Sequence, residues 1–392
     1  MSSPQAPAPA APPRNKKKKR KGPFKVHRYG GWLLYFWHGM RFGAWVRLLQ
    51  RGRFDVTLNC LPNIATVTIW TPVNSGLYWI SEALYGRRAD RFEAPPPVFI
   101  LGHWRTGTTL LHDLMSCDPG LAAPTTYECF FPNHFLLTER AIARAFNVFL
   151  PKKRPQDDVP VAMDRPQEEE FALSILGLGT PYNTLAFPRH GPVDEAYLDL
   201  EGLSDAERGR WANGYLWLYR RLALKHKRRL LLKSPPNTAR IKLLLELFPE
   251  ARFIHIARDP RAVVPSTIKL WRALYSTQGL HNPPRLDPWL ETHVIETFAR
   301  MARAYEEGRK LVPEGRFAEL RMEDLLKDPL GQVEGVYRRL GLEGFAAARP
   351  AFEAFLAARG IHAAGAYELA PELEERIATL LAPYRARFGY GG

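Results

Sequence analysis

A Gly- and Thr-rich loop near residue 105 has the composition of an oxyanion-binding turn. Residues 98–101 read Val-Phe-Ile-Leu, which indicates a buried strand, and the chain continues as Gly102-His-Trp-Arg-Thr-Gly-Thr-Thr109 before an apolar helical pattern. A strand, loop and helix in this order present free backbone amides at the helix N-terminus, and such amides bind oxyanions. Gly107 lets the backbone approach a ligand, and threonine hydroxyls add hydrogen-bond donors.

The loop departs from the ATP-binding P-loop at one position. Gly102 and Gly107 have the spacing of G-x-x-x-x-G-K-[ST], but Thr108 occupies the place of the lysine and the cation is Arg105. That lysine supplies the charge on the β- and γ-phosphates of ATP. A triphosphate is therefore not the expected ligand, although an ATP-dependent small-molecule kinase on a P-loop fold stays open as the alternative.

Two further strand ends carry cations. Residues 252–257 form an apolar run that ends in Arg258-Asp-Pro, and Ser266 follows in the next helical segment, where the two side chains can hold a second phosphate together. The run 229–233 ends in Lys233, followed by Ser-Pro-Pro. Open α/β sheets bind ligands at the carboxyl ends of their strands, so we expect these groups to meet in one crevice.

The elements that would position these residues alternate between strand-like and helix-like segments. This alternation predicts an α/β fold, a P-loop-type parallel sheet covered by helices, with a helical N-terminal extension. The expected strands are 98–101, 229–233, 252–257 and 316–321, and the expected helices lie near 107–117, 237–248, 260–273 and 329–340, with a helical hairpin in 167–226 and a helical pair at the C-terminus.

The positive charge is concentrated at the N-terminus. The 392 residues carry a formal charge of +15, but residues 1–54 contain 13 Lys or Arg and no acid. We interpret residues 1–22 as a disordered basic tail, 23–93 as a helical and aromatic region, and 94–392 as the α/β domain. Aromatic rings beside arginines in 30–53, after the Lys/Arg run 14–21, predict peripheral contact of residues 14–53 with anionic membrane.

The same features limit other classes of protein. The cations form a tail and not a folded face, so no specific nucleic acid is expected. The longest uncharged run, 56–81, contains Asn, Thr, Ser and Pro, which argues against a spanning helix. With no secretory signal evident, and with three cysteines in no paired spacing, we expect a cytoplasmic protein, peripheral at the inner membrane face.

Together the three motifs resemble the PAPS-dependent sulfotransferases, which transfer a sulfuryl group from 3′-phosphoadenosine 5′-phosphosulfate (PAPS) without a metal. The loop Arg105-Thr106-Gly107-Thr108-Thr109 resembles the one that holds the 5′-phosphosulfate. Lys233 resembles the lysine beside it, and Arg258 with Ser266 resembles the clamp for the 3′-phosphate. The resemblance covers about residues 94–345 and implies PAPS as co-substrate, no metal, and catalytic roles for Arg105 and Lys233.

The resemblance fails at the general base. Sulfotransferases of small phenols carry Lys-Thr-His, but Pro235 stands at the position of that histidine. In the tyrosylprotein branch the base is a Glu about two dozen residues after the loop arginine, and Glu128 stands 23 after Arg105. We therefore expect Glu128 to be the base, with His103 in reserve, and Glu128→Gln to keep nucleotide binding but lower turnover.

The acceptor is expected to be a small molecule or a lipid. Acidic residues 168–170 begin a helical segment that could shape the acceptor entrance, and Phe171, Tyr182 and Phe187 lie nearby. This apolar and aromatic company favours a hydroxyl on a lipid-like or aromatic alcohol.

Overall fold

A five-stranded parallel sheet forms the centre of the structure, a computed structural model that describes residues 35–146, 162–284, 289–359 and 368–391. The strand order is β2-β3-β1-β4-β5, and every ladder is parallel. The strands are β1 (Val98–Leu101), β2 (Leu121–Ala122), β3 (Arg229–Lys233), β4 (Arg252–Ala257) and β5 (Phe317–Arg321). The predicted α/β class is thereby confirmed.

Alternating side chains of the strands face two helical layers. Val98 and Ile100 of β1 pack in the smaller apolar cluster, whereas Phe99 and Leu101 pack in the larger one. The smaller cluster is completed by α4 (Thr108–Met115), α12 (Met322–Lys327), α13 (Pro329–Leu340) and α14 (Phe345–Arg359). Because β1 is buried on both faces, its residues are all apolar, as parallel strands between helices require.

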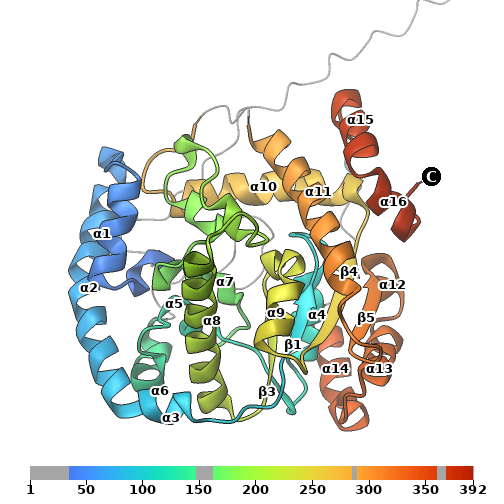
Figure 1. Cartoon of the computed structure of the whole chain (residues 1–392), viewed down its shortest axis with the longest axis horizontal. Coiled ribbons are helices and arrows are strands. Elements are labelled where there is room, and N and C mark those ends of the chain that lie inside the picture. The colour runs from blue at the N-terminus through green and yellow to red at the C-terminus, as the bar shows by residue number, and fades with distance from the viewer. Residues whose placement is uncertain (1–34, 147–161, 285–288, 360–367, 392) are drawn as a thin grey trace, which may run out of the picture.

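The larger layer carries most of the chain. It contains α5 (Thr126–Phe130), α6 (Phe135–Phe146), α7 (Glu169–Leu176), α8 (Asp205–His226), α9 (Ile241–Leu247), α10 (Pro260–Gln278), α11 (Leu290–Arg309), α15 (Pro371–Leu380) and α16 (Ala382–Phe388). Figure 1 shows α10 crossing above the strands and α11 running down beside them.

The N-terminal helices form the outer edge of this layer. They are α1 (Phe42–Arg51), α2 (Leu61–Ser81) and α3 (Arg87–Asp90), and α1 and α2 run along the left edge of Figure 1. Several of the aromatic residues that suggested a lipid boundary are buried here: Phe36, Trp37 and Trp45 lie in the core, whereas Phe42 is 50% exposed. Trp37 donates from its indole nitrogen to the carbonyl oxygen of Gln278 at 2.8 Å. The expected tail 1–22 lies outside the described residues.

Among the described residues, no helix combines the length and the apolar character that crossing a membrane requires.

Candidate functional site

The loop between β1 and α4 has the backbone of a close-approach turn. Gly102 and Gly107 adopt φ of 149° and 100°. A Cβ on Gly102 would lie 2.8 Å from the carbonyl oxygen of Ile256, and a Cβ on Gly107 would lie 2.2 Å from Sδ of Met322. Arg105 also has a positive φ, 70°, which is strained for a residue with a side chain. Strain of this kind concentrates at functional sites.

The first turn of α4 is built to receive an anion. Its N-cap is Gly107, which has no side chain to accept the first helical amides. Thr106 donates its hydroxyl to the carbonyl oxygen of His103 at 2.7 Å, and the amide of Gly102 donates to Thr238 Oγ1 at 2.8 Å. Thr238 belongs to the short helix Pro235–Ala239, which follows Lys233 and Ser234. The segment that follows Lys233 is therefore hydrogen-bonded to the loop.

The arginines and the serine predicted to hold two phosphates are in contact. Arg105 donates from Nε to Ser266 Oγ at 3.0 Å, and Arg258 donates from Nη1 to the carbonyl oxygen of Arg105 at 2.9 Å. Arg258 follows β4, and Ser266 lies in α10, whose N-cap Asp259 accepts from the amide of Arg261 at 2.8 Å. The side chains that would hold the two ends of the nucleotide therefore form one cluster.

Lys233 lies at the end of β3, the strand beside β1, where it is opposite Ile100 in the ladder. Its ammonium is 2.5 Å from Oε1 of Glu168, and its backbone amide donates to Oε2 of Glu169 at 3.1 Å. Both lysine and Glu168 side chains are largely buried. Two consecutive carboxylates at the start of α7 thus fix the main chain and the side chain of Lys233.

Glu168, expected from the sequence only to help shape the acceptor entrance, contacts the lysine of the predicted site. Its second oxygen accepts from the hydroxyl of Tyr182, which in turn accepts from the indole nitrogen of Trp104 at 2.9 Å. Trp104 belongs to the anion loop, so this chain of hydrogen bonds connects the loop to Lys233. The separation of 65 residues between Glu168 and Lys233 leaves no local sequence signal for the pair.

Glu128 has partners of a structural kind. Its side chain is fully buried, lies 2.8 Å from Nε2 of His226, accepts from Lys225, and caps α5 by accepting from the amide of Thr125 at 2.6 Å. Burial opposes ionisation, but His226 and Lys225 outweigh it and lower the pKa of Glu128 to about 2. A carboxylate so strongly stabilised is a weak base, so the role expected for Glu128 stays a prediction that its surroundings do not favour.

The reserve candidate His103 is also a weak base. It stacks on Phe298 with a centroid distance of 4.2 Å, and its Nδ1 lies 3.0 Å from the carbonyl oxygen of Trp104. Burial lowers the pKa of His103 to about 3, so its ring is neutral at physiological pH.

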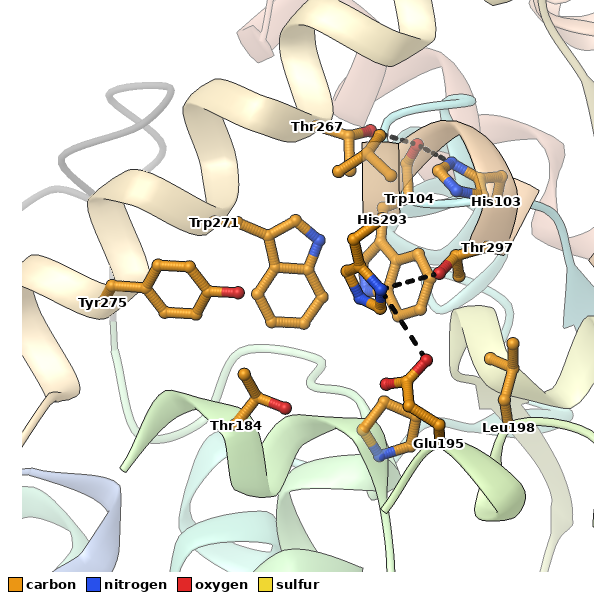
Figure 2. Close-up of a pocket in the computed structure, with 12 residues that line it drawn as sticks. His103, Trp104, Thr184, Glu195, Leu198, Thr267, Trp271, Tyr275, His293 and Thr297 are labelled. Atoms are coloured by element: carbon orange, nitrogen blue, oxygen red, sulfur yellow. Dashed lines mark hydrogen bonds and ion pairs between the residues drawn. The ribbon is translucent and has the colours of Figure 1, made fainter. Parts of the chain in front are cut away.

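Trp104 of the loop also lines a cavity whose other walls include residues of α10 and α11 (Figure 2). Trp104, Trp271 and Tyr275 form its apolar part. The free space for a water-sized molecule is about 10 Å³, which is about what one water needs. The cavity is therefore nearly filled by its own side chains, and a larger molecule has to displace them.

The polar end of this cavity contains Glu195 and His293, whose Oε2 and Nδ1 lie 3.7 Å apart (Figure 2). Burial raises the pKa of Glu195 to about 7 and lowers that of His293 to about 4. Near neutral pH His293 is therefore neutral, and Glu195 lies near the midpoint of its titration, so this end of the cavity offers polar groups beside an apolar part.

The structure thus brings Arg105, Thr106–Thr109, Arg258 and Ser266 together, and it places Lys233 at the next strand end. Glu128 sits instead in the ion-pair cluster with Lys225.

Comparison with known proteins gives one family. Residues 96–347 match the sequence model of the sulfotransferase family. The chain is 40% identical over 367 residues to the omega-hydroxy-beta-dihydromenaquinone-9 sulfotransferase Stf3 of Mycobacterium bovis and to that of Mycobacterium tuberculosis. Each match covers 93% of this chain and 94% of the mycobacterial protein.

Two solved structures share the fold. Sulfotransferase STF9 from Mycobacterium avium has a TM-score of 0.62 at 18% identity, covering 89% of this chain and 97% of that chain. Sulfotransferase STF1 from Mycobacterium tuberculosis H37Rv has a TM-score of 0.59 at 19% identity, covering 86% and 90%. Because the sequence identities are below 20%, these two comparisons show that the fold is shared and nothing more.

Proposed function

The chain belongs to the sulfotransferase family and is a PAPS-dependent sulfotransferase, and from this premise we propose that its acceptor is the hydroxyl of a lipid-like alcohol. Two observations support this acceptor class. The mycobacterial relatives at 40% identity are sulfotransferases of an omega-hydroxy menaquinone derivative. The cavity beside Trp104 is lined by the aromatic side chains of Trp104, Trp271 and Tyr275.

The contacts among Arg105, Arg258 and Ser266 are the main support for the proposed PAPS-binding site. The amides of the loop and of the first turn of α4, with Thr106–Thr109, would bind the 5′-phosphosulfate. Arg258 and Ser266 would bind the 3′-phosphate, and Arg105 lies between the two. The side chains present therefore fit a nucleotide with two separated anionic groups, with charge neutralised by Arg105 and Lys233 and no metal in the proposed scheme.

We assign the base role to Glu168, since it contacts the lysine that would neutralise the departing phosphate. In the transfer, the acceptor oxygen forms a bond to sulfur while the bond from sulfur to the phosphate oxygen breaks. Glu168 would take the acceptor proton, and Lys233 would stabilise the charge on the leaving phosphate. Glu128 is kept as the rival candidate, and its contacts with Lys225 and His226 argue against it.

Nucleotide titration tests the donor site. By calorimetry we expect the protein to bind adenosine 3′,5′-bisphosphate in preference to ATP with Mg²⁺. Arg258→Ala should weaken that binding about 10- to 150-fold, the value of one charged hydrogen bond. Arg261→Ala is the matched control, because Arg261 is exposed on the same segment and pairs with Glu374. Equal losses in both variants, or a preference for ATP, would contradict the assignment.

The acceptor is tested by transfer of label. Radiolabelled PAPS is incubated with the protein and with a lipid extract or a water-soluble metabolite extract. We expect label in the lipid fraction, and label confined to water-soluble products would refute the lipid acceptor.

Membrane contact through residues 14–53, with a cytoplasmic location at the inner face, is retained as a proposal. Its support is now the Lys/Arg run 14–21, because Phe36, Trp37 and Trp45 are buried. Deletion of residues 1–25 should weaken sedimentation with anionic vesicles but leave turnover of a water-soluble acceptor unchanged.

A further inference from the structure

Helix α2 has its polar side chains inside and its apolar side chains outside. Its buried residues include Asn63, Thr71, Asn74 and Ser81. Its exposed side chains include Ile69, which is 71% exposed. A surface helix of a water-soluble domain normally has the reverse arrangement, with the apolar stripe facing the core.

Several polar groups on the inner side of α2 are hydrogen-bonded, although Oδ1 of Asn63 has no partner within the described residues. Asn74 donates to the carbonyl oxygens of His38 and Met40, the latter at 2.9 Å. The indole nitrogen of Trp45 donates to Thr68 Oγ1 at 2.9 Å. Turning α2 over would break these hydrogen bonds and leave buried polar groups unpaired, at a cost of about 1–3 kcal/mol each.

The outward face carries exposed apolar side chains along the whole length of α2. Exposed aliphatic side chains recur along the helix and just beyond its two ends, namely Leu58, Leu61, Ile69, Val73, Ile80 and Leu84. Two exposed tryptophans, Trp70 and Trp79, lie among them. Contiguous exposed apolar surface of this kind marks a docking site, and amphipathic tryptophan rings suit the boundary between lipid headgroups and acyl chains.

The charge around this face points to one partner. There is no charged residue between Asp55 and Glu82. Exposed arginines flank both ends, Arg47 and Arg53 before the helix and Arg87 with Arg88 after it. The two acids that bound the strip are ion-paired, Asp55 with Arg189 and Glu82 with Arg221. An uncharged apolar strip flanked by exposed arginines complements an anionic bilayer, in which acyl chains lie beneath negative headgroups.

We propose that α2 lies in the plane of an anionic phospholipid surface, with its apolar face inserted at the headgroup boundary and its flanking arginines on the phosphates. This inference rests on the exposed side chains of α2 and on the arginines near its ends, and it does not depend on the identity of the proposed acceptor. The basic tail 14–21, nearby in sequence, adds electrostatic attraction.

The position of α2 connects that surface to the aromatic cavity. The segment before α2 contacts the residues that follow α10, since the amide of Thr57 donates to the carbonyl oxygen of Leu280 at 3.4 Å and Asn59 donates to Asn282 at 3.1 Å. Tyr275 and Trp271 of α10 line the cavity. This contact joins the segment before α2 to the chain that leaves α10, the helix that contributes Trp271 and Tyr275 to the cavity.

Vesicle sedimentation tests this inference with a matched control. Full-length protein is mixed with phosphatidylcholine vesicles with or without phosphatidylglycerol. We expect binding that requires phosphatidylglycerol, and we expect Ile69→Glu/Val73→Glu to weaken it about tenfold or more. Leu311→Glu/Leu380→Glu places the same charges at exposed leucines elsewhere and should bind as the wild type does. Circular dichroism confirms that both double variants are folded.

Three results would overturn the inference. The α2 variant could bind vesicles as tightly as its control, or deletion of residues 1–25 could abolish binding altogether. Light scattering could instead show a dimer that the α2 substitutions dissociate, which would assign the face to a second copy of the chain. Turnover of a water-soluble acceptor is measured in parallel. Loss of sulfuryl transfer without loss of vesicle binding would contradict the proposed function and leave the proposal for α2 intact.

Discussion

Substitution of Glu168 by Gln separates the two candidate bases. Glu168 contacts the ammonium of Lys233 and the hydroxyl of Tyr182, and an amide of the same shape keeps the bond to the tyrosine but cannot take a proton. Loss of a general base lowers the rate about 10²- to 10⁴-fold. Glu128→Gln removes a carboxylate whose partners are Lys225 and His226, so we now expect turnover per folded molecule to stay near that of the wild type.

The assay follows labelled sulfate transfer at saturating acceptor, with adenosine 3′,5′-bisphosphate titrated calorimetrically. For Glu168→Gln, nucleotide affinity should stay within about threefold while turnover falls at least about 100-fold. Urea unfolding is run on both variants, because removal of either buried carboxylate can cost stability. Turnover of Glu168→Gln within about threefold of the wild type would refute the reasoning, and a selective loss of turnover in Glu128→Gln would restore Glu128 as the base.

Three further outcomes follow from burial and backbone geometry. The pKa of Glu128 is about 2 against an ordinary 4.5, so its ionised form contributes about 3 kcal/mol above pH 4.5, and urea melts of wild type and Glu128→Gln should converge as the pH falls toward 2. Gly107→Ala should weaken adenosine 3′,5′-bisphosphate binding about 5- to 100-fold in calorimetry, because φ of 100° strains a side chain; unchanged affinity would contradict the close-approach loop. Arg240→Met leaves Glu170 fully buried without its bidentate partner and should lower the free energy of unfolding by about 3–5 kcal/mol, whereas a loss below about 1 kcal/mol would count against that pair.

The strands that carry the site are predictable because their signal is local. The runs 98–101, 229–233 and 252–257 match β1, β3 and β4 to the residue, since each is an apolar run closed by a polar turn. The two-residue strand β2 has too few side chains to form a pattern and was missed. Residue 316 was expected in the last strand, but β5 begins at Phe317.

Contacts between distant residues are the part that sequence reasoning could not supply. The spacing from Arg105 favoured Glu128, but nothing in the sequence shows that Lys225 and His226, almost a hundred residues later, surround it. Likewise the aromatic rings of Trp37 and Trp45 are equally consistent with lipid and with core until their partner is known. Periodicity identifies the two faces of a helix, but it does not say which one the rest of the chain covers.

Under the proposal that the acceptor binds in the cavity beside Trp104, the tightness of this cavity would determine how the acceptor enters. With about 10 Å³ free, aromatic side chains have to swing aside before an acceptor can enter. Opening, rather than diffusion, then limits the association rate, which should level off as acceptor concentration rises. We therefore expect compounds that resemble the acceptor to differ mainly in the rate at which they leave the cavity.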